Sequence, residues 1–223
     1  MPGRLQNKNC NMEICMGEAQ SWGVDVAGLE VELPIIPIQP NFAISLLMVI
    51  DHGVGFGEHI GRELARRLAP LRPEIVVGTA TLGIPVAIEV SRHLEIDRYV
   101  ILQKSRKIHL DDALTKTITS ITSHGEQRLL LDRRAIPLLA GRRTVVVDDV
   151  VATGSSLKGS IELAREAGAI VVGAGVILTE AHAWRAVLGS DADLVRGLGH
   201  IPQFENVAHR WQPIAATMDP NRG

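Results

Sequence analysis

A strand-like apolar segment in this 223-residue chain leads directly into two adjacent carboxylates. Residues 144–147 suit a buried strand, Asp148 and Asp149 follow it, and a short turn containing Gly154 comes before two consecutive serines. In open α/β sheets, ligands bind at the carboxyl ends of the strands. The order of these residues therefore predicts an α/β fold, with acidic and phosphate-binding groups side by side at that edge.

The turn after the two acids has the chemistry of an anion site. Gly154 frees it from Cβ clashes, so consecutive backbone N–H groups can converge on one anion. A helix N-terminus adds positive potential, and Ser155 or Ser156 can cap the helix and donate to a phosphate oxygen. The carboxylates would repel that phosphate, so they suit a ribose diol or a divalent cation carried by the ligand. An ordinary strand followed by a capped helix is the alternative.

Two other phosphate motifs are excluded. The chain has no Gly-Lys-Ser/Thr sequence, so it contains no Walker A loop. Residues 53–57 approach a dinucleotide fingerprint but lack its third glycine at the required spacing.

A second glycine-bounded turn, residues 78–83, lies between a predicted strand and a predicted helix. Its backbone donors and two threonines form another candidate anion cradle, and a purely structural turn is an equal alternative. Lys104, Arg106 and Lys107 cluster after the next predicted strand. A solvated basic turn is the usual meaning of such a cluster, but beside an anion loop these cations could stabilise a departing anion.

Composition excludes several classes of protein. The formal charge of −2 provides no field for nucleic acids or acidic membranes. The two cysteines, Cys10 and Cys15, fit no zinc motif, and the eight histidines show no metal spacing. Apolar runs such as 42–50 are far shorter than a membrane span, and we see no secretion signal. We therefore expect a cytoplasmic protein with no nucleic acid or membrane partner.

Periodicity predicts alternating helices and strands. The expected helices are 58–71, 85–94 and 156–167, and the expected strands are 74–78, 98–103, 128–131, 144–147 and 169–178. This alternation predicts a doubly wound, mostly parallel sheet. Residues 31–38 contain Pro34 and Pro37, which suggest an edge strand or an extended lead-in. We expect a poorly ordered segment at 1–24, one domain at 25–210 and a tail at 211–223.

Residues 145–156 resemble the phosphoribosyl-diphosphate signature of the type I phosphoribosyltransferases: an apolar strand, two acids, then Ala-Thr-Gly and small hydroxyl residues. The resemblance spans roughly 36–204 and is strongest to the adenine and xanthine branch. It implies a small hood over the sheet and transfer of a phosphoribosyl group to a purine, with diphosphate released. Asp148 and Asp149 would bind the ribose hydroxyls. The 5′-phosphate would be held by Val151, Ala152, Thr153, Gly154, Ser155 and Ser156.

The same resemblance assigns the diphosphate to the first loop, through Thr79, Ala80, Thr81 and Gly83. Leu82 departs from the family, which commonly has Ser or Arg before that glycine. Lys104 is the best candidate for the cation beside the diphosphate, followed by Arg106 or Lys107. Magnesium would arrive mainly with the diphosphate, with Asp148 and Asp149 as its protein contacts, and the protein alone would hold no metal.

Residues 109–127 have the composition of a mobile loop, which in the family closes over the substrates. His124 and Glu126 are its candidates for moving a proton at the base, with a solvent-exposed pair as the alternative. The loop has no aromatic residue, another departure from the family.

For the base pocket we consider 48–53, with Asp51 and His52, and 198–204, with Phe204, although core packing is the commoner role of a lone Phe. Adenine is slightly favoured over the 6-oxopurines, and orotate and uracil are not expected. The family also implies a homodimer. The alternative function is a non-catalytic regulatory protein that binds phosphoribosyl diphosphate.

Overall fold

A five-stranded parallel sheet forms the centre of the molecule. The computed structural model describes residues 20–105, 113–119 and 126–219. The strands are β4 (Ile75–Thr79), β5 (Tyr99–Leu102), β8 (Arg143–Val151), β9 (Ile170–Glu180) and β10 (Val195–Ile201), in the order β10-β9-β8-β4-β5. The order of connection reverses between β4 and β8, and ligands of such folds bind at that point.

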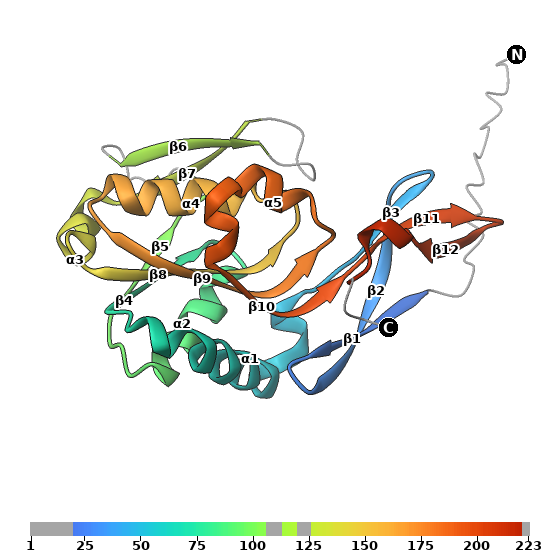
Figure 1. The fold of residues 1–223 in the computed structure, drawn as a ribbon, viewed down its shortest axis with the longest axis horizontal. Helices are drawn as coiled ribbons and strands as arrows, with labels where there is room; N and C mark the ends of the chain where they lie inside the picture. The colour runs from blue at the N-terminus through green and yellow to red at the C-terminus, as the bar shows by residue number, and fades with distance from the viewer. Residues whose placement is uncertain (1–19, 106–112, 120–125, 220–223) are drawn as a thin grey trace, which may run out of the picture.

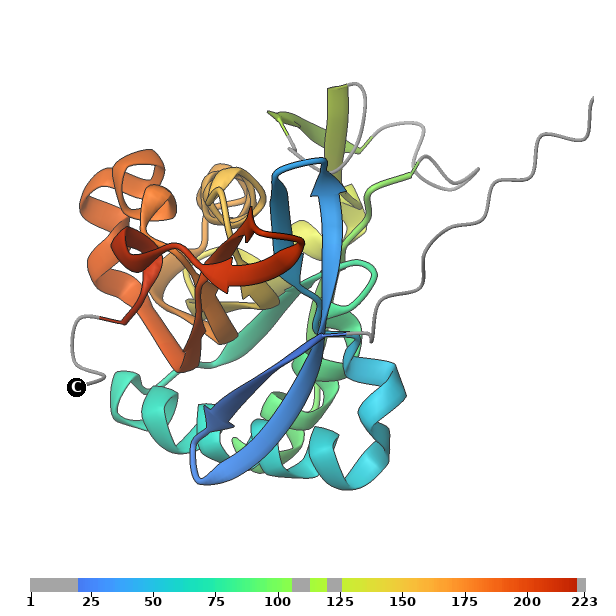
Figure 2. The same ribbon diagram turned by 90° about the vertical axis from the view of Figure 1, so that its right-hand side faces the viewer.

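Helices cover both faces of this sheet (Figures 1 and 2). On one face are α1 (Gly53–Leu68) and α2 (Gly83–His93), and on the other are α3 (Ile136–Leu139), α4 (Ser155–Glu166) and α5 (Ala183–Leu188). Short 3-10 turns are η1 (Val49–His52), η2 (Ala69–Leu71), η4 (Arg133–Ala135), η5 (Gly189–Leu194) and η6 (Ala215–Thr217). The prediction of a doubly wound α/β fold is confirmed.

The first helix shows why periodicity located these elements. Phe56, Ile60, Leu64 and Leu68 recur every fourth residue, and all four are buried against the sheet and α2. The helix begins at Gly53, earlier than the expected residue 58, and the η2 turn replaces its expected last residues.

A second, antiparallel sheet forms the hood beside the carboxyl ends of the parallel strands (Figure 1). Its strands are β1 (Ser21–Val26), β2 (Leu29–Gln39), β3 (Phe42–Ser45), β11 (Gln203–Val207) and β12 (Arg210–Pro213). The two ends of the chain thus meet in one sheet. Strand β1 begins before the domain boundary expected at residue 25, and β12 crosses the one expected at 210.

Strand β2 contains both prolines yet lies between β1 and β3. Its first half, through Pro34, pairs with β1, and its second half, from Ile35, pairs with β3. Each half therefore has one edge free of ladder bonds, and the register shifts between Pro37 and Gln39. Prolines are tolerated at such edges and bulges.

The segment expected to be a loop at 109–127 contains a strand. Strand β6 (Leu114–Thr119) pairs antiparallel with β7 (Glu126–Leu131). Its alternating threonines suit a half-buried strand. Ile118 and Leu129 pack on Gly159 of α4, and Lys116 forms a 2.8 Å ion pair with Glu162, so the hairpin is fixed on that helix.

Candidate functional site

The two predicted anion loops meet at the switch between β4 and β8. The first loop joins β4 to α2, and the second joins β8 to α4. A Cβ on Gly83 would lie 2.9 Å from Asp148 Oδ1, so the start of α2 is packed against the first of the two acids. The fold thus places two helix N-termini around one carboxylate pair, where their first N–H groups lack intrahelical acceptors.

The acid pair is unevenly solvated. Asp148 is 5% exposed, whereas Asp149 is only partly buried, and the Asp149 N–H donates to Asp148 Oδ1 at 3.1 Å. Burial, reinforced by the neighbouring Asp149 carboxylate, raises the pKa of Asp148 well above its ordinary value. The Lys104 ammonium, just beyond β5, acts in the opposite direction on that pKa. Lys104 therefore belongs to the same electrostatic site as the acids.

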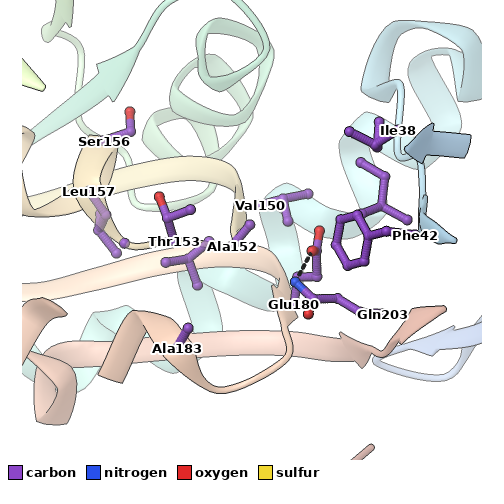
Figure 3. Close-up of a pocket in the computed structure, with 13 residues that line it drawn as sticks. Ile38, Phe42, Val150, Ala152, Thr153, Ser156, Leu157, Glu180, Ala183 and Gln203 are labelled. Carbon is purple, nitrogen blue, oxygen red and sulfur yellow. Dashed lines mark hydrogen bonds between the residues drawn. The ribbon is translucent and has the colours of Figure 1, made fainter. Parts of the chain in front are cut away.

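The second loop turns into α4 through Gly154, whose φ of 86° favours glycine. Thr153 Oγ1 accepts the Ser155 N–H at 3.3 Å, so neither serine provides the side-chain cap expected for this helix. Ser156 Oγ is buried and has no hydrogen-bond partner among the described residues. Figure 3 shows the hydroxyls of Thr153 and Ser156 pointing to the same side of the loop, as a shared anion would require.

The first half of the first loop is buried in the core. Thr79 is fully buried and its Oγ1 is 3.1 Å from Ser160 Oγ, while the buried Ala80 donates its N–H to the Leu102 carbonyl. Thr81 is exposed after a cis peptide bond with Ala80, and Gly83 begins α2. Thr81 is thus the exposed part of this loop, whereas the Thr79 side chain is engaged in the core, and the anion-binding role of the loop stays a prediction.

Three predicted residues, Arg106, Lys107 and His124, lie outside the described residues. Glu126 begins β7, and its side chain also lies outside the description. Their roles stay predictions.

A cavity of about 180 Å³ lies beside the second loop, between it and the hood (Figure 3). The hood, the end of β8, the second loop and the end of β9 all contribute to its lining. The lining residues are Ile38, Phe42, Ile44, Val150, Val151, Ala152, Thr153, Gly154, Ser156, Leu157, Glu180, Ala183 and Gln203.

The three residues predicted for the base pocket do not line this cavity. Phe204 is 1% exposed and packs edge-on against Trp22, with ring centroids 5.5 Å apart, so it belongs to the core of the hood. Asp51 is exposed on η1, and His52 faces a separate hollow beside β2 with its ring 4.9 Å from that of Phe56. The lining by Phe42, Glu180 and Gln203 was missed, although Gln203 lies within the predicted segment 198–204.

Comparison with known proteins agrees with this geometry. The model of the phosphoribosyl transferase domain family matches residues 57–201, more than half of the chain. The chain belongs to the phosphoribosyltransferase family. The match contains both anion loops of this phosphoribosyltransferase and leaves the first hood strands outside.

Individual relatives act on different purines. The chain is 30% identical over 142 residues to a xanthine phosphoribosyltransferase of Bifidobacterium adolescentis, covering 62% of this chain and 72% of the relative. It is 35% identical over 115 residues to an adenine phosphoribosyltransferase of Gluconobacter oxydans, covering 52% and 61%. The Giardia lamblia adenine phosphoribosyltransferase, solved with 9-deazaadenine, has the same fold, with a TM-score of 0.63, 21% identity and coverage of 74% and 92%.

In the part of the chain that the structure describes, no cluster of three or more His, Cys, Asp or Glu side chains could hold a metal ion. No helix within the described residues is both long and apolar enough to cross a bilayer.

Proposed function

We propose that this phosphoribosyltransferase joins a free purine to the ribose of phosphoribosyl diphosphate and releases diphosphate, with adenine ahead of the 6-oxopurines. The observation that carries the proposal is the contact of Gly83 with Asp148, which brings two helix N-termini and an acid pair to one edge of the sheet. A base nitrogen forms the bond to C1′ while the C1′–O bond breaks. The electron pair of the C1′–O bond leaves with the diphosphate, and the proton of the base nitrogen is released to solvent or to the departing diphosphate.

The two anion loops divide the substrate between them. Asp148 and Asp149 accept hydrogen bonds from the ribose hydroxyls, and the second loop, including the orphan hydroxyl of Ser156, holds the 5′-phosphate. The first loop holds the diphosphate through Thr81 and the start of α2. Lys104 stabilises the negative charge that develops as the diphosphate departs.

The residues of this site suit a magnesium ion that binds together with the diphosphate. Carboxylates and phosphate oxygens are its usual ligands, and the raised pKa of Asp148 indicates a buried acid that lacks sufficient positive charge. When bound, the ion would neutralise charge on the leaving diphosphate, with Asp148 and Asp149 as its protein contacts.

The cavity beside the second loop is the base site in this proposal. Phe42 and Val150 provide apolar walls for a flat aromatic ring, and the second loop, which holds the phosphoribosyl group, borders the same cavity. A base bound there lies next to the sugar, as glycosidic bond formation requires.

The test is the double variant Asp148→Asn plus Asp149→Asn, assayed for diphosphate release with magnesium and a panel of adenine, hypoxanthine, xanthine, guanine and orotate. We expect turnover to fall by at least about 100-fold, because each ribose contact and magnesium contact loses its charge. The matched control is Glu95→Gln plus Asp97→Asn, two exposed acids outside the cavity, which should retain wild-type turnover.

Unchanged turnover in the double variant contradicts the assignment of the acids. Binding of phosphoribosyl diphosphate by the wild-type protein without diphosphate release, across the whole panel, contradicts the enzyme and favours the regulatory alternative.

We further propose that the protein is a cytoplasmic homodimer, as the family resemblance implies. Light scattering at micromolar concentration should give twice the 24.1 kDa chain mass. A monomer mass contradicts the dimer.

A further inference from the structure

A buried carboxylate–amide pair lies at the border between the parallel sheet and the hood. Glu180 ends β9, Gln203 begins β11, and Gln203 Nε2 donates to Glu180 Oε1 at 2.9 Å (Figure 3). Glu180 is 5% exposed, and burial raises its pKa despite the hydrogen bond from Gln203. The proposed transfer of the phosphoribosyl group uses neither side chain.

The cavity around this pair is mostly apolar. Ile38, Phe42 and Ile44 line it from the hood, and in Figure 3 the Glu180 carboxylate lies between Val150 and Phe42. Among the described residues lining the cavity, Glu180 is the only one with a titratable side chain. A buried polar group in apolar surroundings discriminates strongly between ligands that can and cannot pair with it.

The pair is held in place by its backbone. The Gln203 N–H donates to Thr217 Oγ1 at 3.0 Å, and the Gln203 carbonyl accepts the Ile214 N–H at 2.8 Å. Glu180 is in register with Ile201 across β9 and β10. Because Oε1 is engaged by Gln203, Oε2 is the carboxylate oxygen available to a ligand, and Gln203 has a second Nε2 hydrogen to donate.

Building on the proposed function, we propose that Glu180 and Gln203 read the 6-position edge of the base and select a 6-aminopurine. Glu180 Oε2 accepts from the exocyclic amine, and Gln203 donates to the neighbouring ring nitrogen. This donor and acceptor pattern is the one by which side-chain amides recognise adenine in nucleic acids, and carboxylates accept hydrogen bonds from amino groups of bases in the same way. A 6-oxopurine instead places oxygen lone pairs against the carboxylate.

The substitution Glu180→Gln reverses this pattern without changing the shape of the side chain. The hydrogen bond from Gln203 holds the amide oxygen at the position of Oε1, so the new NH₂ group occupies the position of Oε2. The cavity then presents a donor where it presented an acceptor. That donor opposes the amine of adenine and matches the oxygen of hypoxanthine.

We would measure kcat/KM for adenine and hypoxanthine in the wild-type protein, Glu180→Gln and the exposed control Glu95→Gln. In Glu180→Gln, the ratio of adenine to hypoxanthine kcat/KM should fall at least about 100-fold, as expected when one buried hydrogen bond is mismatched and another gained. The KM for phosphoribosyl diphosphate should stay within about twofold, because the substitution keeps the shape of the side chain and Glu180 is proposed to contact the base and not the phosphoribosyl group. The control should behave as the wild-type protein does.

A second variant, Gln203→Met, removes the donor and should lower adenine kcat/KM while leaving hypoxanthine less affected. If wild-type turnover is present but both variants keep its base ratio, the proposed pair is overturned and the proposed function stands. If the wild-type protein turns over no base, the proposed function fails. Calorimetry of adenine binding with ribose 5-phosphate present then tests the pair alone: weaker binding by Glu180→Gln supports it, and equal or absent binding overturns it.

Discussion

Gly154 lies against the backbone of Trp184, whose carbonyl oxygen and Cα are 3.0 and 3.1 Å from the position of a Cβ on the glycine. The turn between β8 and α4 thus combines a left-handed backbone with a close approach of α5. Each requirement on its own favours glycine. Their combination makes glycine the best-suited residue at this position.

The variant Gly154→Ala should destabilise the protein by at least about 2 kcal/mol, because a left-handed alanine costs about 1–2 kcal/mol and the backbone clash adds to it. Gly141→Ala is the matched control, since Gly141 also has a positive φ of 74° but nothing within 4 Å of its Cβ position. Gly141→Ala should lose only the stability that a left-handed alanine costs. Urea unfolding measures both, and equal losses would show that the Trp184 contact is unimportant.

Gly83→Ala tests the contact between the two loops. The added methyl would lie 2.9 Å from Asp148 Oδ1, so the carboxylate must move from its position at the site. We expect kcat/KM for phosphoribosyl diphosphate to fall about 10- to 100-fold, the effect of a misplaced binding group. Gly55→Ala on α1, with open space around its Cβ position, is the control and should keep full activity. Wild-type kinetics in Gly83→Ala would sink the prediction.

The acid pair should make the ligand-free protein less stable as pH rises. The folded-state pKa of Asp148 is raised, so the unfolded chain ionises first and stability is lost from about pH 4, the ordinary aspartate pKa, upward. Asp148→Asn removes this loss, so its Tm should exceed that of the wild-type protein at pH 7–8 and the two should converge near pH 4. Differential scanning calorimetry across this range is the measurement, with the exposed Asp97→Asn as control.

With magnesium and phosphoribosyl diphosphate present at pH 7–8, the wild-type Tm should instead exceed that of Asp148→Asn, because the ligand binds the wild-type site more tightly than the variant site. A wild-type Tm that does not depend on pH, or an Asp148→Asn variant less stable at every pH, would refute a buried, uncompensated acid.

Local patterns were enough to predict the parallel core. Long apolar strands and four-residue periodicity, as in α1, are properties of the segment itself, and the acid pair and Gly154 are adjacent in sequence. The hood was harder to predict because its strands come from both ends of the chain. Phe204 and Gln203 are neighbours on one strand, so they face opposite sides: Phe204 pairs with the buried Ala43, and Gln203 pairs with Ile44 of the cavity. Only the pairing with β3 determines that Phe204 faces the core of the hood and Gln203 faces the cavity.

Glu180 illustrates the same limit. Like Asp148, it follows an apolar run within its strand, but no neighbour in sequence marks it as part of a site. Its partner comes from another sheet, 23 residues later. Strand β6 was missed for a different reason: its threonines fit both a polar loop and a strand, and its packing on α4 decides between them.

Strand β3 lies near the start of the chain, and its partner β11 lies near the end. Synthesis on the ribosome therefore builds the ligand site in two stages. At about 5–20 residues per second, both anion loops are complete while the chain beyond α4 is still being made. Until Gln203 emerges, β3 exposes an unpaired strand edge, which is a template for association with other chains. If the proposed function holds, the newborn protein therefore completes the loops that hold the sugar phosphate before the residues that choose the base.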